Sequence, residues 1–205
     1  MDLYTYVPAL IAFGGVVIGG TITGITNFII TKKSTQLRLV EKIFDKRIQA
    51  HEEVLKIPQA LNTMINTYQV DDFNNIISYP FILNSLADYE IFKNVIYEST
   101  IKNMHWLDIE LIRELNYLQD YIATLDLNIK ELPESQYIKI GLIIKQDFIG
   151  LSMALNKQIE KFFEINIYSV NANPSKGHHK YPLQETMGRL NSTLLSKNKD
   201  FFATI

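Results

Sequence analysis

The amino-terminal stretch of this chain, residues 7–30, constrains its folding more than any other feature of the sequence. No charged residue lies between Asp2 and Lys32. A helix of about 20 apolar residues is long enough to cross the roughly 30 Å hydrocarbon core of a bilayer. Because a helix satisfies its own backbone hydrogen bonds, one such segment can span lipid alone. A fully buried core helix is the alternative, but core helices rarely stay uncharged for so long. We therefore predict a transmembrane helix.

The residues that flank this stretch predict how it is inserted. A cleaved signal peptide would begin with basic residues, whereas this chain begins with Met-Asp-Leu-Tyr-Thr-Tyr. Basic residues instead follow the stretch, at Lys32, Lys33, Arg38, Lys42, Lys46 and Arg47. Loops rich in lysine and arginine stay on the cytoplasmic side. We expect an uncleaved helix in the bacterial inner (cell) membrane, with the amino terminus outside and the rest of the chain in the cytoplasm.

One face of the expected span carries small and polar residues. At about 100° per residue, this face comprises Ala12, Gly15, Gly19, Thr23, Thr26 and Asn27. Small residues let helices approach closely in a membrane, and hydroxyl or amide groups can bond across the contact. A plain anchor is the alternative, because glycine is common in membrane helices. A lone span has no partner in its own chain, so we predict a homo-oligomer in which Thr23, Thr26 and Asn27 line a narrow polar path.

The rest of the sequence predicts an all-α protein, with one transmembrane helix followed by a cytoplasmic helical bundle. We divide the chain into a tail and span (1–31), a basic juxtamembrane helix (32–57), a helical bundle (58–170), and a loop with a basic helix (171–205). Apolar residues at helical spacing predict helices over 58–68, 81–99, 107–127 and 183–202, and a long core helix from Pro133 to about residue 167. Pro58 is expected to end or kink the juxtamembrane helix.

No motif in the sequence indicates catalysis or metal binding. The absence of cysteine excludes disulfides and suits a reducing cytoplasm. His51 lacks the second histidine of a helical zinc motif, and the adjacent His178 and His179 are poorly placed to share one ion. Arg47 and His51 resemble the Arg/His pair of helical HEPN-type RNases, but are one residue too close together. We predict no metal, no cofactor and no enzymatic activity, with an unrecognised enzyme as a remaining alternative.

A basic cluster near the carboxyl terminus is the candidate ligand site outside the span. It comprises Lys176, His178, His179, Lys180 and Arg189, with Tyr181 beside them. Cations beside an aromatic ring can hold phosphate and stack a base, so a nucleotide or nucleic acid is a candidate ligand. A solvated basic tail is the alternative, because blocks of like charge usually interact only with water.

The layout of the chain, with a Gly/Thr-rich span from Gly15 to Asn27, a basic juxtamembrane helix and a small helical domain, resembles the membrane effectors of bacterial antiphage systems. Hailong-type channel effectors are one such class. The resemblance implies an oligomeric channel or pore, controlled by its cytoplasmic domain. The alternative is an anchored scaffold or adaptor that recruits a cytoplasmic partner protein to the membrane.

Overall fold

The computed structural model describes residues 7–70, 76–129, 132–168 and 177–204. Its longest element is helix α1, Val7–Asn62. Contacts within the chain divide it into two compact units, residues 1–45 and 46–205, and each is described by itself. The division lies within α1, inside the segment 32–57 that we expected to form one juxtamembrane helix.

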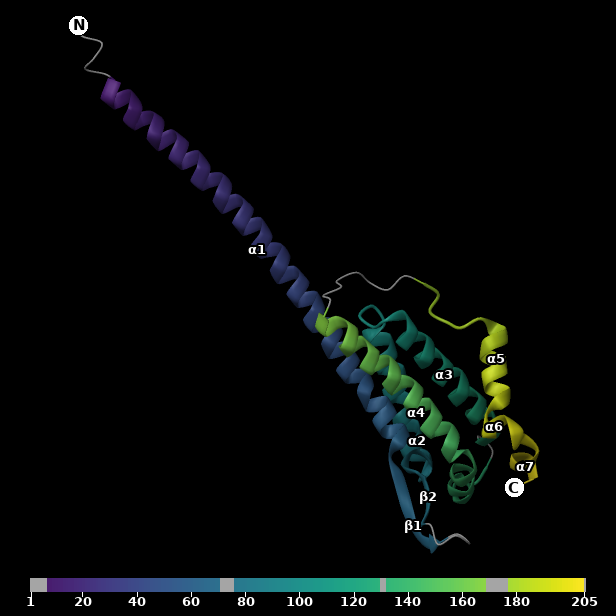
Figure 1. The fold of residues 1–205 in the computed structure, drawn as a ribbon. Helices are drawn as coiled ribbons and strands as arrows, with labels where there is room; N and C mark the ends of the chain where they lie inside the picture. Colours follow the sequence, from purple (N-terminus) through teal and green to yellow (C-terminus); the bar gives the residue numbers. More distant parts are fainter. Residues whose placement is uncertain (1–6, 71–75, 130–131, 169–176, 205) are drawn as a thin grey trace. The chain divides into compact units, whose positions relative to one another are not determined.

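The described part of the first unit is residues 7–45 of α1, coloured purple to blue in Figure 1. Large apolar side chains are exposed along it, including Phe13 (69 %), Ile22 (61 %) and Phe28 (70 %). The helix is long and apolar enough to cross a membrane, and none of its apolar window is buried in the described chain. This exposure sets the segment apart from a soluble protein's core helix, which is mostly buried.

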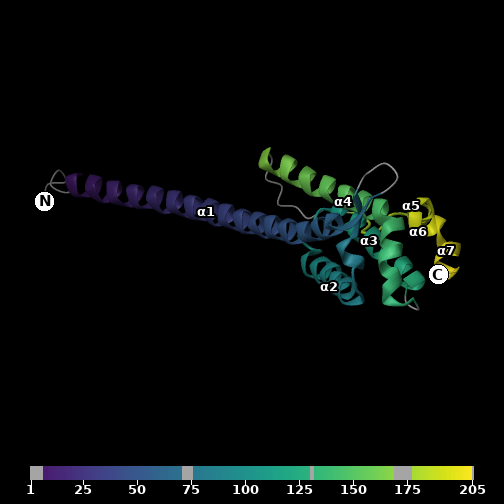
Figure 2. The ribbon, with the colours of Figure 1, turned by 90° about the horizontal axis from the view of Figure 1, so that it is seen from below.

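The second unit is a mostly helical bundle with one hydrophobic core. Residues 46–62 of α1 pack with α2, α3 and α4, and Figure 2 shows α2 and α4 on either side of this part of α1. The core includes Val54 and Leu61 of α1, Leu115 of α3 and Ile144 of α4. The elements are α2 (Leu86–Asn103), α3 (Ile109–Ile129), α4 (Tyr137–Tyr168), and the short 3-10 helices η2 (Phe81–Leu83) and η3 (Glu134–Gln136). These helices confirm the predictions for 107–127 and for the long core helix after Pro133. Over 81–99 the structure has η2 and then α2, with Ser85, whose backbone is extended, between them, so the prediction is confirmed only for the part that lies in α2.

The prediction of a helix over residues 58–68 is wrong. Helix α1 continues through Pro58, and the chain then forms a two-stranded antiparallel sheet of β1 (Met64–Val70) and β2 (Ile76–Pro80). The expectation that Pro58 ends the juxtamembrane helix is therefore wrong, because α1 continues to Asn62 although proline removes one backbone hydrogen bond. Ile65 lies opposite Tyr79 in the sheet, and the β-branched and aromatic residues here favour a pleated surface over a helix.

The prediction of a single helix over residues 183–202 is also wrong. The structure has three short helices, α5 (Leu183–Ser192), α6 (Leu194–Lys197) and α7 (Lys199–Thr204). Thr193 between the first two has an extended backbone, and its hydroxyl accepts a hydrogen bond from the Ser196 N–H. Asp147 of α4 accepts hydrogen bonds from the N–H groups of Leu194 and Leu195, both at 2.9 Å. A carboxylate from another helix therefore starts α6 and draws Leu195 into the core.

Candidate functional site

The small-residue face expected in the membrane is open in the first unit. All six residues, Ala12, Gly15, Gly19, Thr23, Thr26 and Asn27, are exposed. A Cβ atom added at Gly15 or Gly19 would meet nothing within 4 Å beyond the helix's own backbone. The Thr23 hydroxyl donates to the Gly19 carbonyl at 2.8 Å, so its hydrogen is satisfied without water. The face can therefore approach another apolar surface closely.

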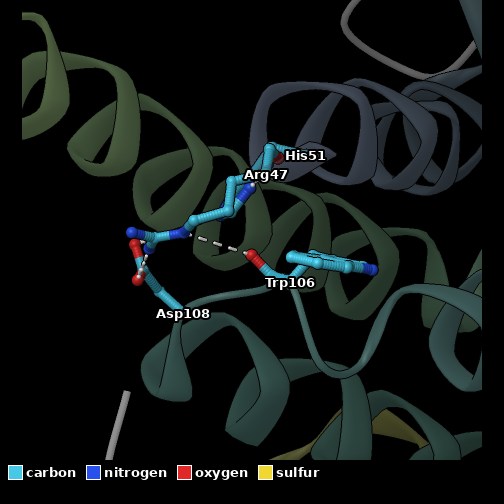
Figure 3. Close-up of polar contacts among 4 residues, drawn as sticks. All are labelled: Arg47, His51, Trp106 and Asp108. Carbon is cyan, nitrogen blue, oxygen red and sulfur yellow. Dashed lines mark hydrogen bonds and ion pairs between the residues drawn. The ribbon is translucent and has the colours of Figure 1, made fainter. Parts of the chain in front are cut away.

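A second candidate site lies within the second unit, where α1 first becomes buried. Figure 3 shows the Arg47 side chain directed at Asp108 and at the Trp106 carbonyl, which lie on the segment between α2 and α3. Arg47 Nη2 is 2.5 Å from Asp108 Oδ1, and its Nε donates to the Trp106 carbonyl at 3.4 Å. Only 6 % of Arg47 is exposed. The ion pair therefore holds the buried part of α1 against the start of α3, with the guanidinium shielded from water and the Asp108 carboxylate partly exposed.

His51, one turn after Arg47, completes this cluster. Its ring is fully buried and stacks on Phe162 of α4, with ring centroids 3.5 Å apart and planes within 6°. Nδ1 lies 2.8 Å from the Arg47 carbonyl, so Nδ1 carries the hydrogen of the neutral ring. Nε2 lies 4.0 Å from Asp108 Oδ2.

The environment of His51 favours its neutral form. Burial lowers the pKa of His51 from 6.5 to about 4, against the opposing effects of its hydrogen bond to the Arg47 carbonyl and of the Asp108 charge. A catalytic histidine must reach its substrate, and this ring has no exposed surface. Arg47 and His51 can therefore lock α1 in place on the domain, but are not positioned for the chemistry of an RNase pair.

From the sequence, Arg47 is one of the basic residues that follow the apolar stretch, and this cluster was not predicted. A signal for it existed in the spacing. Arg47, His51 and Val54 follow one another at intervals of four and three, which puts them on one face of a helix. A charged residue on the same face as buried apolar residues requires a partner inside the protein. The identity of that partner, Asp108, could not be read from the spacing.

The basic cluster near the carboxyl terminus comes together only in part. His178, His179 and Lys180 are exposed, and line a cavity of about 470 Å³ with Tyr181, Pro182 and Arg113 of α3. Arg113, which the sequence reading did not include, donates from Nε to the His178 carbonyl at 2.8 Å and from Nη1 to Glu110 at 2.8 Å. Lys180 Nζ lies 3.9 Å from Asp120. Lys176 lies outside the described residues.

Arg189 does not line this cavity but pairs with Glu114 of α3. Its Nη2 is 2.7 Å from Glu114 Oε2, and its guanidinium lies 3.8 Å from the Tyr117 ring centroid. Tyr181 donates its hydroxyl to the same carboxylate at 2.7 Å, and burial with the Glu114 hydrogen bond raises the pKa of Tyr181 to about 12. Glu114 is itself buried. Arg189 thus compensates a buried acid and fastens α5 to α3, rather than joining the cations of the cavity.

Comparisons with models of known protein families, with curated protein sequences and with solved structures find no match to this chain.

Proposed function

We propose that this chain is a single-pass protein of the bacterial inner membrane, with its amino terminus outside and its helical domain in the cytoplasm. The supporting observation is the exposed apolar surface of α1 between residues 12 and 30. Exposed patches of this size on a protein indicate contact with a membrane or another protein. A helical span satisfies its own backbone hydrogen-bonding groups in lipid. The basic residues from Lys32 onward remain on the cytoplasmic side.

The span in this proposal joins several copies through its small-residue face. The open space at Gly15 and Gly19 allows close approach of a second helix, as small residues do in membrane interfaces. Cyclic closure is the usual outcome when identical chains associate. In such a ring Thr23, Thr26 and Asn27 line a narrow polar path through the bilayer.

The proposed activity is that of a channel- or pore-type effector, controlled by the cytoplasmic domain and acting in antiphage defence. Its support is the continuity of α1, which carries the apolar segment and, from Arg47 onward, forms part of the domain core. A ligand that binds one arrangement of the domain better than another shifts the equilibrium between them. Because one helix belongs to both parts, such a shift can reach the span without an intervening linker.

The basic cavity beside Arg113 is where this proposal places an anionic ligand, a nucleotide or a nucleic acid. Arg113 and Lys180 supply permanent charge there, and Tyr181 supplies a ring against which a base can stack. Lys180→Ala should weaken binding of a labelled oligonucleotide to the protein, while Lys197→Ala, on α6, should not. Equal binding by both variants would remove this ligand from the proposal.

The deciding experiment combines copy number with ion flux. The full chain is reconstituted in nanodiscs to count copies by mass photometry, and in liposomes to measure release of a small dye. Gly15→Leu with Gly19→Leu should reduce the chain to single copies and abolish flux. Gly14→Leu, which changes a glycine on another face, should leave both unchanged. A wild-type chain that is solitary in lipid would contradict the channel proposal.

A second candidate function, an anchored adaptor, is favoured by one surface of the domain. A groove of about 360 Å³ between α2 and α3 has an apolar floor that includes Ile96, Tyr97 and Ile122, and polar side chains such as Lys93 and Asp126 also line it. A cytoplasmic partner protein could bind there. Replacing residues 1–31 with an unrelated membrane anchor separates the two candidates, since an adaptor would keep its activity and a channel would lose it.

A further inference from the structure

We infer that the interface between copies continues beyond the membrane, as a parallel coiled coil along α1 that runs through Leu37, Val40 and Phe44 and ends before Arg47. This inference rests on the oligomer proposed above and identifies its contacts outside the bilayer. It assigns an interaction surface to residues 32–45, and the partner of that surface is a second copy of the same segment.

Residues along α1 follow the spacing of a coiled coil. Two series, each with a seven-residue interval, run through the first unit at alternating distances of four and three. This is the pattern by which apolar positions of a coiled coil meet their neighbours. A strict seven-residue interval in a helix of 3.6 residues per turn also predicts a left-handed supercoil. The first series is Val16, Thr23, Ile30, Leu37 and Phe44, and the second is Ala12, Gly19, Thr26, Lys33 and Val40.

These series share four of the six residues of the small-residue face of the span, and Gly15 and Asn27 lie beside them. Ala12, Gly19, Thr23 and Thr26 belong both to that face and to the seven-residue series. Helices that meet along this face in the membrane therefore present Leu37, Val40 and Phe44 to one another beyond it. The α-helix is continuous over this range, so nothing interrupts the phase of the pattern.

In residues 32–45 the apolar side chains of the two series lie on one side of the helix and most charged side chains lie on the other. Leu37 is 70 % exposed, and Val40 and Phe44 are half-buried. Arg38 and Lys42, both exposed, fall at positions that point away from the seam. An apolar stripe with its charges on the outer side is typical of a helix that packs with others. Leu39, 56 % exposed, is the one large apolar residue of this segment on the outer side.

Lys33 is the charged residue within the seam, and it lies three residues after the end of the apolar stretch at Ile30. A single lysine at such a position can set the register and number of helices in a coiled coil, at a cost in stability. Its long side chain can also reach the head-group region with its charge. Lys33 therefore marks the passage from the membrane part of the seam to the cytoplasmic part.

The seam between copies ends where the same positions of α1 become buried in the second unit. The next members of the two series after Phe44 are Arg47, His51 and Val54. All three are buried in the second unit, with exposures of 6 %, 0 % and 0 %. Their partners are Asp108, Phe162 and the domain core. The same stripe of α1 thus faces the chain's own domain from Arg47 onward, which leaves residues up to Phe44 for contacts between copies.

A second copy is the partner that these observations favour. Membrane insertion makes all copies parallel and places them at the same depth, so that identical residues lie at the same height. A parallel coiled coil needs this arrangement, because each residue of the seam packs against its counterpart in the neighbouring helix.

The experiment uses the absence of cysteine from the chain, so that one substitution introduces the only thiol. Leu37→Cys, Val40→Cys and Phe44→Cys are compared with Arg38→Cys and Lys42→Cys in the full chain, reconstituted in nanodiscs and treated with a short bismaleimide. Gly19→Cys reports the membrane part of the interface. We expect several-fold more cross-linked dimer from Leu37→Cys, Val40→Cys and Phe44→Cys than from the two controls.

Failure of this inference can be told apart from failure of the proposed oligomer. Cross-linking at Gly19→Cys, without an excess at residues 37, 40 and 44 over the controls, would overturn the inference and leave the oligomer intact. Loss of cross-linking at all these positions would overturn both.

Val54→Cys tests the stated end of the seam. It belongs to the same series as Val40 but is fully buried in the second unit, so it should give no more dimer than Arg38→Cys. Strong cross-linking at Val54→Cys would show that the seam continues into the domain. That result would contradict the assignment of Arg47 as its end.

Discussion

Helix α1 places similar residues in two different environments. Between residues 12 and 30 its isoleucines are exposed, with Ile22 at 61 % and Ile25 at 58 %, whereas Ile57 near its other end is fully buried. Both parts form regular helix, so the backbone does not distinguish them. The difference lies in what covers the side chains. A protein core surrounds Ile57, and we propose that lipid and other copies surround Ile22 and Ile25.

The cluster around Arg47 lies where this change of environment begins. Residues 38–46 include five exposed charged residues, whereas Arg47 is buried and paired with Asp108. A buried charge without a partner is costly, so this pair makes a shift or rotation of α1 against the domain unfavourable. One polar contact can thus mark where α1 changes from an exposed helix to a helix buried in a domain.

The largest effect is expected from removing side-chain volume in the buried part of α1. Ile57→Ala should lower the free energy of unfolding of the second unit by about 2–5 kcal/mol, because it deletes buried methyl groups and leaves a cavity. The same substitution at Ile25 should change it by less than about 0.5 kcal/mol. Urea titration of the full chain in detergent, followed by Trp106 fluorescence, measures both. Equal effects at the two positions would contradict the assigned environments.

A charge placed within residues 7–30 of α1 tests whether lipid surrounds this stretch. Ile22→Lys should oppose membrane insertion by about 3 kcal/mol, the cost of a lysine at the centre of a span. We expect more of this variant to be released from membranes by alkaline carbonate. Thr35→Lys, beyond the apolar stretch, is the control and should behave as the wild type. If Ile22→Lys stays in the membrane as firmly as Thr35→Lys, residues 7–30 do not span it.

The contact at the boundary can be weakened without changing its shape. Asp108→Asn leaves the buried Arg47 guanidinium without its counter-charge, and should lower the free energy of unfolding of the second unit by about 2 kcal/mol. The full penalty of a deeply buried pair is larger, but the Asp108 side chain is 32 % exposed. Asp45→Asn removes an exposed carboxylate of the same helix and should have no measurable effect in the same titration. Matching results for the two variants would show that the ion pair contributes nothing to stability.

The smallest predicted effect is a dependence of stability on pH through His51. Its pKa is about 4 in the folded chain and 6.5 as the ordinary value, so the unfolded chain binds a proton more readily. The stabilisation is complete above pH 6.5 and is lost as the pH falls toward 4. Between pH 7 and pH 5 this residue should account for a loss of about 1–2 kcal/mol.

The His51 contribution is measured by difference. The free energy of unfolding is measured by urea titration at pH 7 and at pH 5, for the wild type and for His51→Gln. The effect of pH on all other ionisable groups is the same in both proteins, so it cancels when the two losses are subtracted. The variant should lose less stability between these pH values than the wild type. An equal loss in both proteins would show that His51 is not kept neutral by burial.

Periodicity predicted the long helices correctly and failed where tertiary contacts choose the local structure. The predicted helix over 107–127 is α3, because leucines at intervals of four and three can only share a face in a helix. Over 58–68 the spacing of Leu61, Ile65 and Tyr68 also fits a helix, yet β1 forms there. Pairing with β2, which lies beyond the local pattern, decides between the two.

The candidate sites show the same division. The small-residue face is a property of one helix, so its residues could be identified from their intervals alone. The surroundings of Arg47 and Arg189 depend on Asp108 and Glu114, which lie 61 and 75 residues away along the chain. No local pattern reports such pairings. The local pattern therefore places Arg47 with the basic residues after the span and Arg189 with the candidate ligand cluster, whereas in the structure each pairs with an acid from α3 or its start.

The sequence by itself determined the helical character of the chain and the length and apolarity of residues 7–30, because both follow from composition and from intervals along one segment. The tertiary structure alone decided which cations pair with an acid and which residues of α1 are buried in the second unit. It also decided that residues 64–70 form a strand and that residues 183–202 form separate helices. Those outcomes depend on groups distant in the chain that meet only after folding, where burial makes each polar partner necessary.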